Sequence, residues 1–381
     1  MGKIYALSVG INDYSPPVRK LRGCINDVEA VKTYLVDTFG TDRLYLETLT
    51  DSDATRANII KLFRSHLCKA GSDDVVLFHY SGHGARCKAA KEFKRFYPDG
   101  WDEGLVCYDS RMSGGFDLAD KELAVLLAEV ARNSPHISVL LDSCHSGSGS
   151  RDPFHQPRFT HNFPAERALE SYLDGYYTKL LHHDESLVIP ASRHILLAAC
   201  DRVQQALESP NHRGVFTTSL LDTLAESGPD VSYADLFMRV RTTVRRYVDN
   251  QTPQFETYQQ FNAYSGFLGS ATSATARSYH VFFDSEADSW QVNCGALHGL
   301  PNDPSKTVAL ALYRDEQMIG RAEAVQVGAQ TSEIQLLDVD ADPKEQLQGR
   351  ITSLPVPPLE VGLTGDAQGV KVVLDSFSSE A

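Results

Sequence analysis

The chain has 381 residues, of which 42% are hydrophobic, and it carries a formal net charge of −14 at neutral pH. That length is enough for one large core together with a smaller module. The acidic balance and the lack of a Lys/Arg cluster argue against binding to nucleic acid, and no apolar run is long enough to span a bilayer. We therefore expect neither a nucleic-acid partner nor a membrane partner.

The cysteines point to a reducing compartment. There are seven of them, an odd number, and no C-x-x-C spacing occurs. The opening segment MGKIYALSVGIND has the branched apolar residues of a first strand and lacks the small-residue cleavage pattern of an export signal. We expect free thiols and a cytoplasmic location.

Up to about residue 270, strand-like and helix-like segments alternate along the chain. The strand-like segments are apolar throughout, and the helix-like segments place apolar residues at helical spacing. In chain order, the patterns predict strands over 3–11, 43–49, 73–80, 136–142 and 194–200, and helices over 24–39, 55–67, 120–132, 214–226 and 233–248. Strands of this kind between helices are typical of an α/β fold with a mostly parallel sheet covered on both faces.

Two segments depart from this alternation. Residues 148–193 are rich in Gly, Ser, Pro and His and are predicted to be a long inserted loop with a local helix over 165–181. From residue 275 onward, short β-rich stretches bounded by Gly, Pro, Asn and Asp predict a smaller all-β module. The expected division is one α/β domain over 1–270, with a large section over 1–147, the inserted loop over 148–193 and a small section over 194–270, and a β-rich domain over 275–381.

Two predicted strands end in residues that can carry chemistry. The first ends in YSGHG, which contains His83, and the second ends in DSCHSG, which contains Cys144. Since functional residues gather beyond the carboxyl ends of parallel strands, we expect these two side chains to meet. A free thiol has a pKa of about 8.5 and attacks well only once a neighbouring base removes its proton. The backbone N–H groups of Gly84 and Cys144 are the natural donors to an oxyanion.

Other uses of these residues are less well supported. His79, His83 and Cys87 recur at four-residue intervals, which would suit zinc on a helix, but the segment is strand-like and contains helix-breaking Ser-Gly. A protein that kept the fold for binding or scaffolding without turnover is the main alternative to an enzyme. The presence of both a nucleophile and a base argues against that alternative.

Several motifs in order resemble those of caspase-fold cysteine peptidases, and within them the metacaspases and their bacterial relatives, the orthocaspases. YSGHG is followed about sixty residues later by DSCHSG, and YALSVGINDY, LRGCINDVEAV, DGWDEGLVCYD, AACDRVQQALE and GVFTTSLL stand in the family's order. The resemblance covers about residues 3–265 and not the β-rich tail. It implies a caspase-like sheet and a cysteine endopeptidase that uses a dyad of Cys144 and His83.

The resemblance also implies an acidic pocket that binds Arg or Lys before the cleaved bond. Two carboxylates in a partly desolvated slot would favour a cationic side chain, and a guanidinium can be gripped in bidentate fashion. Leu21 stands where caspases that cut after Asp have a pocket Arg. The counterparts of the family's pocket residues are Cys24, Asp27, Ser81 and Asp142.

Calcium activation is a further expectation from the resemblance, although the chemistry itself requires no cofactor. The positions that match the family's calcium ligands are Asp99, Asp120 and Asp152. Calcium needs six or more oxygen ligands. The family's paired acids appear here as Ala119 and Asp120, and Arg151 falls near another ligand position.

Regulation is the last expectation. An enzyme that cuts after basic residues could cut its own inserted loop, which carries Arg151, Arg158, Arg167, Lys179 and Arg193. The β-rich domain could bind a protein partner or regulate the enzyme. Substrates would be proteins or peptides with Arg or Lys at the cleavage site, and the resemblance favours a monomer.

Overall fold

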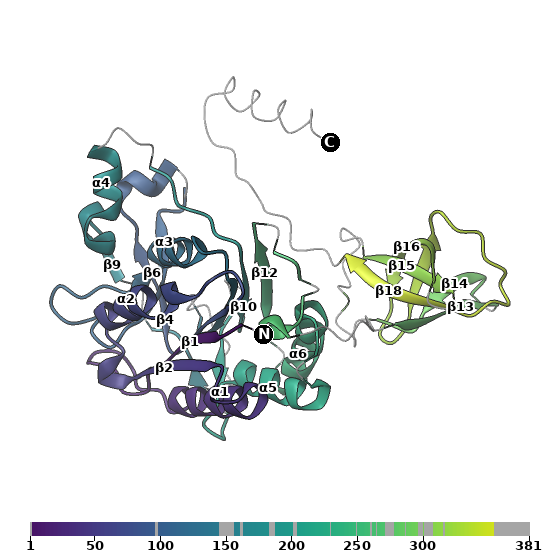
Figure 1. The fold of residues 1–381 in the computed structure, drawn as a ribbon, viewed down its shortest axis with the longest axis horizontal. Coiled ribbons are helices and arrows are strands. Elements are labelled where there is room, and N and C mark those ends of the chain that lie inside the picture. Colours follow the sequence, from purple (N-terminus) through teal and green to yellow (C-terminus); the bar gives the residue numbers. More distant parts are fainter. Residues whose placement is uncertain are drawn as a thin grey trace.

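A computed structural model gives the architecture of the chain (Figure 1). It describes residues 2–95, 98–144, 156–160, 163–182, 187–200, 204–228, 230–248, 250–259, 261–263, 265–270, 278–285, 287–295, 300, 308–314 and 317–353. Within these residues, no helix is both long enough and apolar enough to cross a membrane.

A six-stranded sheet forms the centre of the α/β domain. Its order is β12-β10-β7-β3-β1-β2, and every neighbouring pair is parallel except β10 with β12. The strands are β1 (Ile4–Gly10), β2 (Leu44–Thr50), β3 (Val75–Ser81), β7 (His136–Asp142), β10 (His194–Ala198) and β12 (Gln254–Tyr258). The predicted mostly parallel sheet is confirmed.

Helices cover both faces of this sheet (Figure 1). On β3, Val76, Phe78 and Tyr80 belong to the core that includes α2 and α3, while Val75 and Leu77 belong to the core that includes α1, α5 and α6. Because successive side chains of a strand point to opposite faces, a strand buried on both sides must be apolar throughout. The helices are α1 (Cys24–Phe39), α2 (Arg56–Ser65), α3 (Asp120–Ala131), α5 (Val215–Ser227) and α6 (Tyr233–Tyr247).

The inserted segment is more structured than its sequence predicts. It contributes β9 (Phe163–Glu166) to a small sheet of order β6-β5-β4-β9, in which the other strands are β4 (Gly84–Lys88), β5 (Trp101–Leu105) and β6 (Leu118–Ala119). It also contains β8 (Gln156–Pro157), which pairs with β11 (Leu207–Glu208), and α4 (Tyr176–His182).

The single helix predicted over 165–181 is wrong. A 3-10 segment, η4 (Leu169–Asp174), is separated from α4 by Gly175, whose φ of 78° lies in the left-handed region that ends helices. Arg167, near the start of the predicted helix, instead forms a buried ion pair with Glu122, at 2.7 Å. The remaining 3-10 segments are η1 (Asp51–Asp53), η2 (Leu67–Lys69), η3 (Lys91–Arg95) and η5 (Phe267–Gly269).

A closed antiparallel barrel follows the α/β domain, as the β-rich pattern predicts. Its strand order is β13-β14-β17-β16-β15-β18. The strands are β13 (Tyr279–Asp284), β14 (Ser289–Val292), β15 (Ala309–Arg314), β16 (Gln317–Val327), β17 (Ser332–Leu336) and β18 (Leu347–Ser353). The β-rich stretch near 370–377 lies outside the described residues.

The buried histidines predict a loss of stability in acid. Burial lowers the pKa of His79, His83, His136 and His194 to about 4. An unfolded histidine titrates near 6.5, so between about pH 4 and 6.5 the unfolded chain binds more protons than the folded one. We expect the free energy of unfolding to fall by several kcal/mol, as an order of magnitude, from pH 7 to pH 5. Urea unfolding followed by circular dichroism at both pH values measures it, and equal values would contradict the prediction.

Candidate active site

The two predicted catalytic residues follow neighbouring strands at one edge of the sheet. Ser81 of β3 is paired with Asp142 of β7 at the last position of both strands. His83 and Cys144 follow these residues at the same spacing, and both side chains are fully buried. The register of β3 with β7 therefore brings the ends of these two strands together, as the sequence predicts.

The contacts of His83 fix its tautomer. Its Nε2 lies 2.7 Å from the carbonyl oxygen of Arg19, and its backbone N–H donates to the Tyr14 hydroxyl at 2.7 Å. Since a carbonyl can only accept, Nε2 carries the hydrogen and Nδ1 carries the lone pair. Nδ1 is buried without a hydrogen-bond partner in the described portion of the chain. Burial also lowers the pKa of the ring to about 4, so His83 is neutral and able to accept a proton at Nδ1.

Cys144 is a thiol rather than a thiolate in this state. Burial raises the pKa of its side chain to about 12, and the nearby guanidinium of Arg158 only partly opposes that shift. Attack by the sulfur therefore needs a base that removes the proton as the new bond forms.

The predicted pocket residues come together, and an arginine of the chain itself lies among them. The Arg158 guanidinium is 2.6 Å from Asp27 Oδ2 and 3.0 Å from Asp142 Oδ1, and it donates to the Ser81 hydroxyl at 2.8 Å. Arg158 is fully buried. Cys24 borders the same group, since its thiol donates to Glu208 Oε1 at 3.6 Å. A basic side chain thus fits this pocket.

Three further residues complete the pocket and were not predicted from the sequence. Glu208 Oε1 lies 3.3 Å from Arg158 Nη2 and accepts a hydrogen bond from the Gly23 N–H at 2.8 Å. The Gly214 N–H donates to Asp27, and the Thr217 hydroxyl donates to Asp142 at 2.7 Å. Glu208 and Thr217 stand in the quoted motifs AACDRVQQALE and GVFTTSLL, but no spacing rule indicates that they reach a pocket on β3 and β7.

The wall of the pocket has no room for side chains at two positions. A Cβ on Gly214 would lie 2.1 Å from Asp142 Oδ2 and 2.8 Å from Arg158 Nη1. A Cβ on Gly23 would lie 2.9 Å from Glu208 Oε1. Backbone therefore approaches the guanidinium directly on this side.

The predicted oxyanion donors point at one acceptor. The Gly84 N–H donates to the carbonyl oxygen of Arg158 at 3.0 Å, and the Cys144 N–H donates to the same oxygen at 3.4 Å. Two backbone N–H groups that converge on one carbonyl oxygen form the arrangement that stabilises a tetrahedral oxyanion.

Leu21 stands at the position that the resemblance assigns to the pocket arginine of caspases that cut after Asp. Leu21 is buried, whereas the neighbouring Arg22 is exposed and only its backbone N–H reaches Glu208, at 3.1 Å.

Each of the two described candidate calcium ligands is paired with a cation of the chain. Asp99 is paired with Arg86 at 2.6 Å, and Asp120 is paired with Lys121 at 3.2 Å, while Lys121 also contacts Asp102 at 2.7 Å. The ammonium of Lys121 is thus paired with two acids near this position. Asp152 lies outside the described residues, and among the described ones no group of three metal-binding side chains is found.

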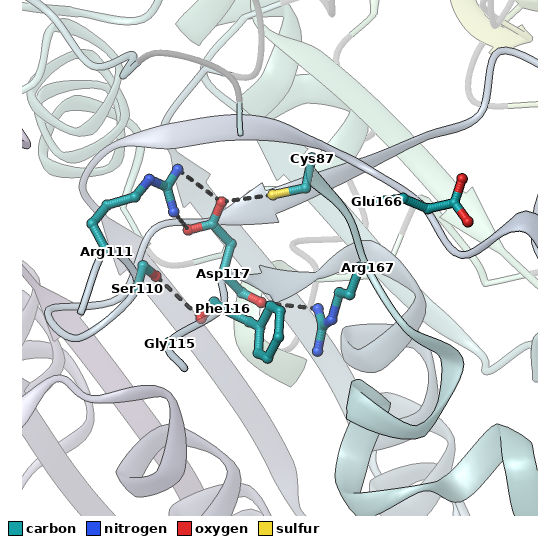
Figure 2. Close-up of a pocket in the computed structure, with 8 residues that line it drawn as sticks. All are labelled: Cys87, Ser110, Arg111, Gly115, Phe116, Asp117, Glu166 and Arg167. Atoms are coloured by element: carbon teal, nitrogen blue, oxygen red, sulfur yellow. Dashed lines mark hydrogen bonds and ion pairs between the residues drawn. The ribbon is translucent and has the colours of Figure 1, made fainter. Parts of the chain in front are cut away.

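The zinc alternative is not supported either. His79 of β3 is bonded to the Ser8 hydroxyl at 2.7 Å, and Cys87 of β4 donates to Asp117 at 3.1 Å. Figure 2 shows Cys87 at a separate small pocket in which Asp117 is also paired with Arg111. The segment is therefore not a helix, because His79 lies on β3, His83 lies between the strands and Cys87 lies on β4, each with different partners.

Comparison with known families agrees with the motifs. The caspase domain family model matches residues 3–264, so the chain belongs to the caspase domain family. Metacaspase-1A of Aspergillus clavatus is 36% identical over 159 residues, which are 40% of this chain and 36% of that protein. Metacaspase-1 of Emericella nidulans is 35% identical over 159 residues, which are 40% of this chain and 38% of that protein. The chain thus matches less than two fifths of the length of these relatives.

Solved structures show a looser likeness. A crystal structure of a protein from Geobacter sulfurreducens has 24% identity and a TM-score of 0.49, covering 67% of this chain and 93% of that one. Caspase-1 from Spodoptera frugiperda has 10% identity and a TM-score of 0.44, covering 72% of this chain and 92% of that one.

Proposed function

We propose that this protein is a cysteine endopeptidase that cleaves after Arg or Lys. The observation that carries the proposal is the placement of Arg158, whose guanidinium is held by Asp27, Asp142 and Glu208 while its carbonyl oxygen accepts from two N–H groups beside Cys144. Three buried carboxylates are costly without a cation, so the pocket selects a positively charged side chain.

In the proposed mechanism, His83 Nδ1 takes the thiol proton as Cys144 Sγ attacks the substrate carbonyl. The N–H groups of Gly84 and Cys144 stabilise the oxyanion that forms. The imidazolium then gives its proton to the leaving amine, and a water molecule hydrolyses the thioester. The contact from Nε2 to the Arg19 carbonyl keeps the ring in the tautomer that this sequence of steps needs.

The test of the proposal is a set of fluorogenic peptides that differ only in the residue before the cleaved bond. Arg and Lys peptides are expected to be hydrolysed, and the matching Asp peptide is expected to be resistant. The alternative, a caspase-like binding protein without turnover, predicts no hydrolysis of any of them. Preferential cleavage after Asp would contradict the pocket proposal.

We propose further that the reaction needs no cofactor. Because Lys121 already pairs with Asp102 and Asp120, calcium would have to displace an ammonium group to be held there. Hydrolysis of the Arg peptide is therefore expected to change less than about twofold between excess EDTA and millimolar Ca²⁺, which corresponds to a change in the barrier of about 0.4 kcal/mol. A strong calcium requirement would favour the activation that the family resemblance implies, with ligands beyond the described residues.

The remaining expectations also belong to this proposal. The substrates are proteins or peptides with accessible Arg or Lys, the enzyme acts in the cytoplasm as a monomer, and it processes itself within the inserted loop. The barrel is proposed to bind a partner or to regulate the enzyme. Its buried core includes Met238 of α6, so a partner bound to the barrel could influence the α/β domain.

A further inference from the structure

Residues 156–160 lie across the candidate active site with backbone bonds on both sides of Arg158. Before Arg158, β8 pairs antiparallel with β11, so that Pro157 is opposite Leu207, and the Arg158 N–H donates to the Ala206 carbonyl at 2.9 Å. After Arg158, the Thr160 N–H donates to the Gly84 carbonyl at 3.2 Å. An extended segment bound by main-chain bonds on each side is how a sheet edge recognises a peptide.

Three independent features then coincide on one residue. The side chain of Arg158 fills the acidic pocket, its carbonyl oxygen accepts from the Gly84 and Cys144 N–H groups, and its N–H is bonded to the strand-like segment at Ala206. A buried structural ion pair would account for the guanidinium alone. It would not require the carbonyl to lie between the two donors that adjoin the nucleophile.

We propose that the Arg158–Phe159 peptide bond is the enzyme's own substrate and is cut intramolecularly. This inference rests on the proposed function and adds to it the particular bond. The other described basic residues of the inserted loop are placed elsewhere. Arg167 is paired with Glu122, Lys179 is exposed on α4, and exposed Arg193 lies over the Phe261 ring.

The chemical steps are those proposed above for a separate peptide substrate, except that the chain is now both the enzyme and the substrate. The sulfur of Cys144 bonds to the Arg158 carbonyl carbon, the bond to the Phe159 nitrogen breaks, and the thiol proton passes through His83 to that nitrogen. Water then adds to the thioester, which releases the Arg158 carboxylate and restores the thiol. The products are a fragment that ends at Arg158 and a fragment that begins at Phe159.

Two consequences follow from the position of the bond. Until it is cut, the Arg158 side chain fills the pocket and Cys144 is 0% exposed, so external substrates are excluded. After the cut, β10 still lies between β7 and β12 in the sheet, with its parallel pairing to β7 joining the two fragments. The fragments are therefore expected to separate under denaturing conditions and to remain together in a native one.

The deciding experiment is intact-mass spectrometry of the purified full chain before and after incubation, with hydrolysis of the Arg peptide measured on the same sample. The expected result is a pair of masses for 1–158 and 159–381 in the wild type, and a single intact mass for Cys144→Ala. Hydrolysis of the peptide without this cut, or with a cut only elsewhere, would overturn the inference and leave the proposed function standing. Neither hydrolysis nor cutting would overturn both.

Matched variants test the role of the side chain. Arg158→Gln is expected to lose the cut, Arg158→Lys to retain it at a lower rate, and Arg193→Gln to be cut as the wild type is. The rate constant should be unchanged by a tenfold dilution, and a rate constant proportional to concentration would overturn the intramolecular step. The masses of the wild-type fragments identify the cleaved bond without any variant. A folding defect in Arg158→Gln would therefore not change the outcome of the test.

Discussion

Replacement of Cys144 by alanine is expected to lower kcat/KM for the Arg peptide by at least about 10³-fold, since loss of a nucleophile removes the covalent route and leaves only binding and oxyanion stabilisation. The side chain is small and buried, and alanine removes only a sulfur atom from the end of a strand. The fold should therefore persist. The measurement is initial-rate kinetics on the wild type and the variant at equal concentration.

The matched control for this variant is Cys68→Ala. Cys68 is a partly buried cysteine in η2, away from the strand ends that carry His83 and Cys144. Its replacement is expected to leave the kinetics within about twofold of the wild type, as for a substitution outside the catalytic groups. Comparable activity in Cys144→Ala and the wild type would contradict the proposed function.

The state of Cys144 explains how such an enzyme could be kept inactive. Cys144 is fully buried, its N–H donates to the Arg158 carbonyl oxygen, and burial raises the pKa of its thiol to about 12. A covered thiol reacts slowly with reagents in solution. We propose that cleavage after Arg158 admits solvent to Cys144 and lowers that pKa toward its usual value, so that access and reactivity increase together.

The features of the site that the sequence predicts are those fixed by strand pairing. Apolar strands that end abruptly in polar residues indicate the sheet edge, and the pairing of Ser81 with Asp142 brings His83 and Cys144 to it. The side of the sheet on which Asp142 lies follows from the period of two along β7. These inferences need only local patterns and one assumption about neighbouring strands.

The features that the sequence does not predict depend on contacts between distant segments. Glu208 reaches the Gly23 N–H across 185 positions of the chain, and Arg158 reaches Asp27 across 131 positions. Neither lies in a segment with a helical or strand period that would fix its direction. The inserted loop is also where the predicted helix fails, because Gly175 and the pairing of Arg167 with Glu122 override the helical pattern.

Replacement of Asp27 by asparagine is expected to lower kcat/KM for the Arg peptide by at least about 30-fold, since the loss of one partner of a buried charge pair costs about 2–5 kcal/mol. Asparagine has nearly the shape of aspartate, and its amide oxygen can still accept from the Gly214 N–H and the Ser81 hydroxyl that now bond to Asp27. The change therefore removes charge more than structure. It is also placed on α1, away from His83 and Cys144 in the chain.

A peptide with citrulline in place of Arg separates charge recognition from general damage to the enzyme, because citrulline has nearly the shape of Arg without its charge. If Asp27 acts by binding the cation, Asp27→Asn lowers kcat/KM for the Arg peptide and leaves the low value for the citrulline peptide nearly unchanged. The control Glu129→Gln removes an acid that is paired with Arg64 on the surface of α3, and it should alter neither value. An equal loss for both peptides in Asp27→Asn would assign Asp27 to the support of the fold. The basis of Arg specificity would then have to lie with Asp142 and Glu208 alone.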